Sequence, residues 1–189
     1  MFGRMLNRRT FLRAGAAGLL GAAVGAPTVA GQAPLLTLTA RQRPRRLPGC
    51  AHPSALWTYA DEWPLVLRVP RGQRFAVALE NRLEEHTTIH WHGLRIPLAM
   101  DGVPYISQPP VLPGETFVYD FTPPDPGTFF FHPHCNTVEA LGRGMAGVLI
   151  VEDEREKNLF DAEHVLTLKD WRVNADGSFQ EFITDAGAG

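Results

Sequence analysis

The 189-residue sequence has no strong excess of charge of either sign, because 18 Lys and Arg residues stand against 20 Asp and Glu residues. This balance gives no indication of the basic surface that nucleic-acid binding requires, nor of a disordered acidic tail. After residue 30, no internal repeat, no low-complexity tract and no long amphipathic helix is evident. The length fits one domain, with room for the beginning of a second.

A long apolar run is also missing. Residues 14–26 form a weakly apolar stretch that is shorter than the roughly 20 residues a membrane-spanning helix needs. Residues 7–13, Asn-Arg-Arg-Thr-Phe-Leu-Arg, carry the twin-arginine pattern, and Thr28–Ala30 offers small residues for cleavage. Residues 1–30 are therefore predicted to be a twin-arginine signal peptide, with an uncleaved membrane anchor or a chance basic patch as the alternatives. We expect the twin-arginine export machinery as a partner, a periplasmic or secreted location, and no permanent membrane span.

Cysteine is scarce, with only Cys50 and Cys135 in the chain. The periplasm and the cell exterior permit disulfides, so these two residues could pair after export. Pairing requires Cα atoms within bonding distance, which a sequence does not reveal. The disulfide and the two free thiols are therefore both kept as alternatives.

After the signal, the sequence consists of short β-favouring runs separated by Pro- and Gly-rich turns. Alternating or continuous apolar patterns predict eight strands, at residues 35–40, 65–69, 75–79, 87–92, 116–121, 128–132, 148–151 and 164–171. Residues 139–145 are long enough for one helical turn. Many short strands with regular turns indicate an all-β sandwich or barrel.

The same pattern suggests a division of the chain. Residues 31–54 hold a first strand and a Pro- and Arg-rich arm, whose residues 41–53 are interpreted as a linker. Residues 55–155 form the main β domain. A charged stretch then leads into residues 156–189, interpreted as a linker and the start of a second domain, with a hairpin turn at residues 174–177.

Two His-x-His pairs are the strongest chemical signal. His90-Trp91-His92 and His132-Pro133-His134 both lie in strand-like sequence, where residues i and i+2 point to the same face about 6–7 Å apart. Neutral imidazole is a good ligand for copper, and also for zinc and nickel. The two pairs together therefore predict a metal-binding face.

The surroundings of the pairs fit that interpretation. Gly93 would allow close backbone approach, and Phe129, Phe130 and Phe131 could shield the site from water. The alternative is that the four histidines of the two pairs are ordinary surface or core histidines. A single His-x-His pair would favour this alternative. The remaining histidines match no ligand motif and are interpreted as ordinary: His52, His86 and His164.

The order of motifs resembles that of multicopper oxidases, the family of laccases and bilirubin oxidases. Residues 88–94, Thr-Ile-His-Trp-His-Gly-Leu, look like its first copper motif, and residues 127–134, Gly-Thr-Phe-Phe-Phe-His-Pro-His, look like its second. Residues 144–153 resemble the strand that follows. The resemblance covers about residues 55–155. It implies an N-terminal plastocyanin-like domain, a Greek-key cupredoxin sandwich, followed by the start of a second cupredoxin-like domain in an apparently truncated chain.

The resemblance also implies roles for the histidines. His90 would bind a type 2 copper, and His92, His132 and His134 would bind a type 3 copper pair. In the family this trinuclear cluster takes half of its histidines from the last domain and reduces dioxygen to water while substrate is oxidised in one-electron steps. The expected partners are therefore copper ions, O2 and the missing C-terminal cupredoxin domains. This chain alone is expected to be inactive; the alternative is a stand-alone periplasmic copper-binding protein without catalysis.

Two further residues need separate interpretation. By the same resemblance Asp101 would assist proton delivery, although an Asp-Gly turn alone would also explain it. Cys135, with Met145 ten residues later, suggests a type 1 copper site. The family's type 1 motif has histidines one and five residues after its cysteine, where this chain has Asn136 and Ala140. No type 1 site is therefore expected here, and Cys135 is interpreted as structural or disulfide-bonded.

Overall fold

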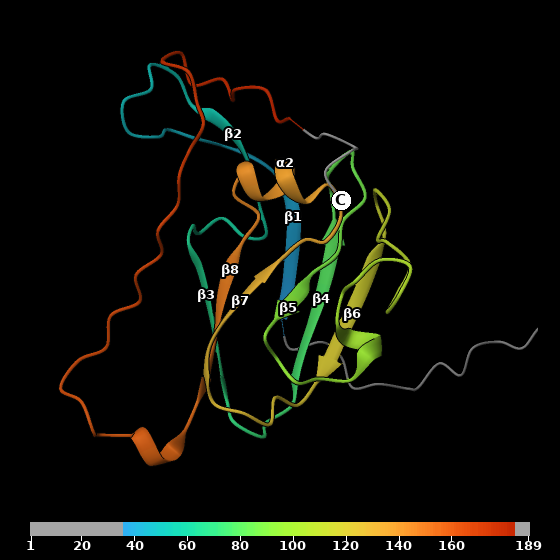
Figure 1. Cartoon of the computed structure of the whole chain (residues 1–189), viewed down its shortest axis with the longest axis vertical. Helices are drawn as coiled ribbons and strands as arrows, with labels where there is room; N and C mark the ends of the chain where they lie inside the picture. Colours follow the sequence, from blue (N-terminus) through green and yellow to red (C-terminus); the bar gives the residue numbers. More distant parts are fainter. Residues whose placement is uncertain (1–35, 184–189) are drawn as a thin grey trace, which may run out of the picture. The chain divides into compact units, whose positions relative to one another are not determined.

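The computed structural model describes residues 36–183, which form two four-stranded β-sheets (Figure 1). The first sheet has the order β2-β1-β4-β6, with bounds β1 Leu36–Arg45, β2 Ser54–Thr58, β4 Phe75–Asn81 and β6 Thr116–Phe121. The second has the order β3-β8-β7-β5, with bounds β3 Leu65–Pro70, β5 His90–His92, β7 Gly127–His132 and β8 Gly147–Glu152. The predicted signal peptide, residues 1–30, lies outside the described residues, and export stays a prediction.

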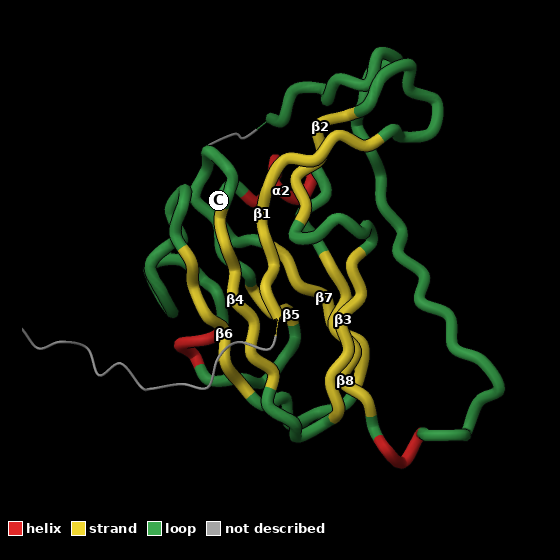
Figure 2. Tube along the Cα trace, turned by 180° about the vertical axis from the view of Figure 1, so that it is seen from behind, coloured by secondary structure: helices red, strands yellow, loops and turns green. Residues whose placement is uncertain are grey.

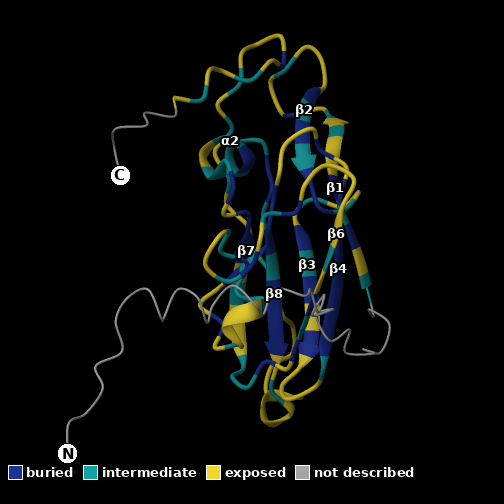
Figure 3. Ribbon diagram, turned by 90° about the vertical axis from the view of Figure 1, so that its right-hand side faces the viewer, coloured by how far each residue is buried: buried dark blue, intermediate teal, exposed yellow. Residues whose placement is uncertain are grey.

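The two sheets share one hydrophobic core. In β3, Leu65, Leu67 and Val69 are buried while Arg68 between them is exposed, as the period of two in a strand requires. Residues from both sheets join a single buried cluster, which includes Val77 of β4. Figure 3 shows this burial concentrated along the strands. The expected all-β sandwich is confirmed, and within it β1–β4 and β3–β8 are the parallel pairs.

The interpretation of residues 41–53 as a linker is wrong for residues 41–45. These residues continue β1 and pair antiparallel with β2. The guanidinium of Arg43 explains why a basic, Pro-containing segment can form a strand here. It donates to the carbonyl oxygen of Thr58 at 2.8 Å and to the carboxylate of Asp61 at 2.6 Å. Residues 46–53 form a loop, as expected.

The C-terminal segment differs more from expectation. Within the described part of the chain, residues 164–171 form no strand, although their sequence alternates. Leu166 and Leu168 are 86% and 96% exposed, so the segment has the pattern of a strand without a sheet to join. In Figure 2 it belongs to a long loop that follows β8. The predicted turn at 174–177 is present, closed by the Gly177 N–H donating to the Asn174 carbonyl at 2.9 Å.

Three short helical segments complete the described residues. They are the 3-10 turns η2 (Leu98–Met100) and η3 (Glu154–Glu156), and the helix α2 (Thr137–Gly142). The helical turn expected at residues 139–145 therefore begins two residues earlier and ends before Met145. No helix among residues 36–183 is long and apolar enough to cross a bilayer.

Candidate metal centre

The first histidine pair lies on β5, which pairs antiparallel with β7. In this register His90 is directly opposite His132, and His92 is opposite Phe130. Trp91 points to the other face of the strand and is fully buried in the core. The alternation that places Trp91 inside therefore directs His90 and His92 to the same outer face, as the sequence predicted.

The second pair reaches the same place differently. β7 ends at His132, so Pro133 and His134 follow the strand rather than continuing it. The expectation of a strand is therefore confirmed for His132 and wrong for His134, because proline has no N–H to donate to a neighbouring strand. His134 is held instead by its backbone N–H, which donates to the hydroxyl of Thr88 at 3.2 Å. Thr88 is buried, and no pattern in the sequence indicated that its hydroxyl would hold His134.

The four imidazole rings form one cluster. The ring centroid of His90 lies 5.5 Å from that of His92, 5.4 Å from that of His132 and 4.7 Å from that of His134. One ligand atom from each of His90, His132 and His134 lies within 4.8 Å of the other two. His92 is outside this group of three, but its Nδ1 lies 3.4 Å from Nε2 of His132. The structure thus brings all four predicted histidines together.

Backbone carbonyl groups hold two of the rings. Nδ1 of His90 lies 2.7 Å from the carbonyl oxygen of Asp101 and 3.4 Å from its carboxylate. Nδ1 of His132 lies 3.0 Å from the carbonyl oxygen of Pro133. A carbonyl oxygen only accepts hydrogen bonds, so each Nδ1 is the donor and each Nε2 is left with its lone pair. Metal-binding histidines commonly have this arrangement.

Burial and mutual proximity favour the neutral form of the second pair, His132 and His134. Burial lowers the pKa of His132 below its ordinary value, and the neighbouring histidines lower it further, against a hydrogen bond to Pro133 that raises it. Burial also lowers the pKa of His134, with His90 contributing in the same direction. Neutral imidazole is the form that binds metal ions.

The aromatic residues next to the cluster differ in their contribution. Phe130 stacks on His132, with ring centroids 4.6 Å apart and an interplanar angle of 24°. Phe131 is instead fully buried in the core, where it packs against Trp91. At Gly93 an added Cβ would make only ordinary contact with Phe129, so close backbone approach is not the reason for this glycine. Its φ of +83° is the reason, because few side chains tolerate that conformation.

The two cysteines of the chain form no disulfide. Cys50 and Cys135 are both free thiols, so of the two alternatives that the sequence left open the structure has the free thiols. Cys135 is buried, and burial raises the pKa of its thiol, against a hydrogen bond with Thr88 that lowers it. Met145 is fully buried in the hydrophobic core.

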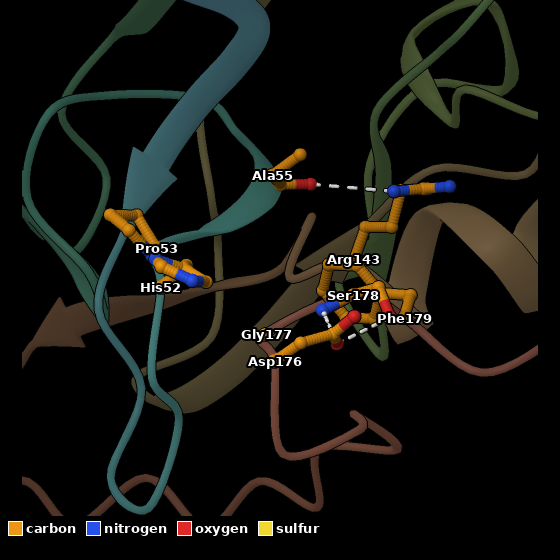
Figure 4. A pocket seen from close by; sticks show the side chains of 8 residues that line it. All are labelled: His52, Pro53, Ala55, Arg143, Asp176, Gly177, Ser178 and Phe179. Atoms are coloured by element: carbon orange, nitrogen blue, oxygen red, sulfur yellow. Dashed lines mark hydrogen bonds between the residues drawn. The ribbon is translucent and has the colours of Figure 1, made fainter.

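Two hollows of the described surface lie away from the histidine cluster. The first, of about 480 Å³, is shown in Figure 4, where Arg143 and Phe179 lie on one side and His52 lies with Pro53 on the other. The second, of about 670 Å³, is lined by β8 and by the first part of the loop that follows it, as far as His164. The exposed side chain of His86 lines neither of them. None of these three histidines belongs to the cluster of described residues that could share a metal ion.

A sandwich of two four-stranded sheets with two histidine pairs brought to one end of a strand pair defines a cupredoxin-like domain. The sequence profile of the family described as multicopper oxidase matches residues 40–156. This match spans more than half of the chain, and the chain therefore belongs to the multicopper oxidase family.

Particular relatives agree with this assignment. Copper resistance protein A of Escherichia coli is 40% identical over 107 residues, which are 56% of this chain and 17% of that protein. The iron transport multicopper oxidase FET3 of Candida albicans is 41% identical over 128 residues, 65% of this chain and 20% of that protein. The crystal structure of a multi-copper oxidase from Pseudomonas parafulva superposes with a TM-score of 0.72 at 46% identity, over 78% of this chain and 36% of that one.

These coverages describe one part of larger proteins. The chain spans about a fifth of the length of the two curated relatives and about a third of the solved structure. The solved structure confirms the cupredoxin-like fold that the motif resemblance implied.

Proposed function

We propose that His90, His92, His132 and His134 bind copper and supply half of the histidine ligands of a trinuclear copper cluster in a multicopper oxidase. In this proposal His90 serves the type 2 copper and the other three serve the type 3 pair. The observation that carries the proposal is the convergence of the four rings, with three ligand atoms within 4.8 Å of one another. The copper named in the descriptions of relatives supports the choice of metal.

The donor set fits copper. Imidazole nitrogen is a preferred ligand of this metal, and among divalent ions of the first transition row copper binds most tightly to a given nitrogen site. In His90 the hydrogen-bonded Nδ1 leaves Nε2 available, whereas in His132 the lone pair of Nε2 faces Nδ1 of His92 at 3.4 Å. When bound, a trinuclear copper cluster supplies the four-electron reduction of dioxygen to water, with electrons taken from substrate one at a time.

The exposure of the rings supports a shared site rather than a closed one. His132 is buried, whereas His92 and His134 are exposed, so one side of the cluster faces solvent. A metal bound on such a face would have open coordination positions, because the histidines of this chain approach it from one side only. We therefore propose that further cupredoxin domains supply the remaining histidines, and that the partners are these domains, copper ions and O2.

Asp101 is the proposed proton carrier of this half-site. Its carboxylate lies next to the ring of His90, with one oxygen 3.4 Å from Nδ1. The carboxylate is partly exposed, so it can exchange protons with solvent while remaining beside the ligand. A positioned carboxylate of this kind can orient a water molecule and pass a proton to it.

Metal analysis tests the copper proposal. The purified chain is loaded with copper and with zinc in competition, alongside the variants His92→Ala and His132→Ala and the control His164→Ala. We expect copper to be preferred, the two cluster variants to lose copper, and the control to retain it, because His164 is exposed and outside the cluster. Equal copper content in all four proteins would refute the assignment.

Oxygen uptake separates the proposal from its alternative, a stand-alone copper-binding protein without catalysis. We expect no reduction of dioxygen to water by the copper-loaded chain alone. Addition of the downstream domains of a matching oxidase is expected to produce uptake, because those domains would complete the ligand set. A chain that binds copper in the metal analysis but never supports uptake in the mixture would favour the alternative.

A further inference from the structure

The turn that follows η2 passes unusually close to the strand that carries the first histidine. Gly102 has a φ of +76°, and a Cβ added there would overlap the carbonyl group of Ile89 and lie 2.8 Å from the backbone nitrogen of His90. Real Cβ atoms essentially never approach that closely. Only glycine, which has no Cβ, therefore allows this turn to rest directly on the backbone before His90.

The backbone at Ile89, which the Gly102 turn contacts, is itself fixed in position. Ile89 is fully buried, and its N–H donates to the hydroxyl of Tyr119 at 2.7 Å. Tyr119 is itself fully buried and lies on β6. The backbone of Ile89 is thus held at its N–H by the Tyr119 hydroxyl and at its carbonyl group by the Gly102 turn.

The turn is anchored as well. The sulfur of Met100 accepts a hydrogen bond from the backbone N–H of Asp120 at 3.3 Å, which ties η2 to β6. The Asp101 N–H donates to the Leu98 carbonyl at 3.0 Å and closes the 3-10 turn. The Asp101 carbonyl is consequently presented to His90 from a fixed position, 2.7 Å from Nδ1.

We propose that Gly102 is a positioning residue, which allows the Asp101 carbonyl to hold metal-free His90 as the Nδ1–H tautomer with Nε2 free to bind a metal ion. Metal binding by Nε2 rests on the proposed function, whereas the position of the proton on Nδ1 does not. A backbone carbonyl accepts the proton on Nδ1 whether or not metal is present, so the ring is oriented before binding. This role belongs to the backbone of Asp101 and is separate from the proton transfer proposed for its carboxylate.

Nitrogen NMR of the whole metal-free chain tests the tautomer. The protein is labelled with 15N, and two-bond proton–nitrogen correlations distinguish the protonated from the unprotonated nitrogen of each imidazole at an alkaline pH where the rings are neutral. The spectrum of a His90→Gln variant identifies the signals of His90. We expect the proton on Nδ1 of His90, and a proton on Nε2 would overturn the proposal.

Three variants separate the contributions. Gly102→Ala is expected to lose the Nδ1–H signal of His90, because the turn or the strand must move. Gly72→Ala is the matched control, since Gly72 has nearly the same φ, +75°, but has open space where the Cβ would be. It is expected to keep the wild-type signal. Asp101→Asn is also expected to keep it, because the carbonyl is unchanged.

Each outcome decides the question. An unchanged Nδ1–H signal in folded Gly102→Ala would refute the role of Gly102, and a changed tautomer in Asp101→Asn would assign the proton to the carboxylate and refute the carbonyl. If Gly102→Ala does not fold, the wild-type chain and Asp101→Asn still test the carbonyl contact. No metal enters these measurements, so their failure leaves the copper analysis intact, and failure of the copper analysis leaves the tautomer result intact.

Discussion

The two histidine pairs have the same spacing but different support. His90 and His92 are fixed by a strand whose central residue, Trp91, is fully buried among aromatic rings. His134 follows the end of β7 and depends on one hydrogen bond to the hydroxyl of Thr88. A His-x-His pattern therefore identifies candidate ligands without identifying how their geometry is held. The first pair should fail through loss of core packing, and the second through loss of a polar contact.

The largest expected effect is at the first pair. Trp91→Ala removes a fully buried side chain that packs against Phe75, Tyr119, Phe121 and Phe131. We expect the free energy of unfolding to fall by about 3–5 kcal/mol, because a large cavity remains in the core. Urea unfolding followed by circular dichroism measures this change. A loss below about 1 kcal/mol would contradict the view that core packing holds this pair.

The next effect is at the second pair. Thr88→Val keeps the side-chain shape but removes the hydroxyl that accepts the His134 N–H. We expect a loss of about 1 kcal/mol in the free energy of unfolding. We also expect roughly a tenfold loss in copper affinity, because a group that orients a ligand has been removed. Urea unfolding and a copper titration measure the two quantities.

Thr87→Val is the control for that substitution. Thr87 is a buried neighbour whose hydroxyl donates only a long hydrogen bond, 3.4 Å, to the Thr88 carbonyl within the described contacts. It should leave copper affinity near that of the unmodified chain. Equal losses in the two variants would show that burial of a threonine, and not the contact with His134, is responsible.

The smallest expected effect is at Pro133, between the histidines of the second pair. Pro133→Ala should lower the free energy of unfolding by about 0.4–1 kcal/mol, because the unfolded chain gains backbone freedom. Copper affinity should change little, since the hydroxyl of Thr88 still holds His134. Calorimetry and the same copper titration provide the measurements. A loss of copper binding as large as that of Thr88→Val would show that the proline ring, and not the hydrogen bond, holds the second pair.

Much of the site was predictable because its signals are local. The four histidines were identified from two short motifs, and the structure brings their rings together. Asp101 was identified too, but the contact that its backbone makes with His90 was not. A carbonyl group is present in every residue, so no sequence pattern indicates which one will accept a hydrogen bond. Thr88 was missed for a related reason, since a threonine in a β-favouring run is ordinary.

Most of the strands were also predictable from local sequence patterns. Seven of the eight predicted runs contain strands of the sandwich, while residues 164–171 do not form one. Leu166 and Leu168 have the alternation of a strand, yet a strand exists only where another backbone pairs with it. The opposite error occurred at residues 41–45, whose Arg and Pro content indicated a loop. There β2 supplies the partner, and Arg43 satisfies the carboxylate of Asp61.

The sequence by itself determined the all-β class, the four histidines that form the cluster and the resemblance to multicopper oxidases, because short runs of consecutive residues carry both the side-chain chemistry and the period of a strand. Only the tertiary structure decided that His90 lies opposite His132, that Thr88 holds His134, and that the turn at Gly102 rests on the strand before His90. These three contacts join segments that are distant along the chain. Their geometry depends on sheet register and on the shape of the shared core, which no local pattern specifies.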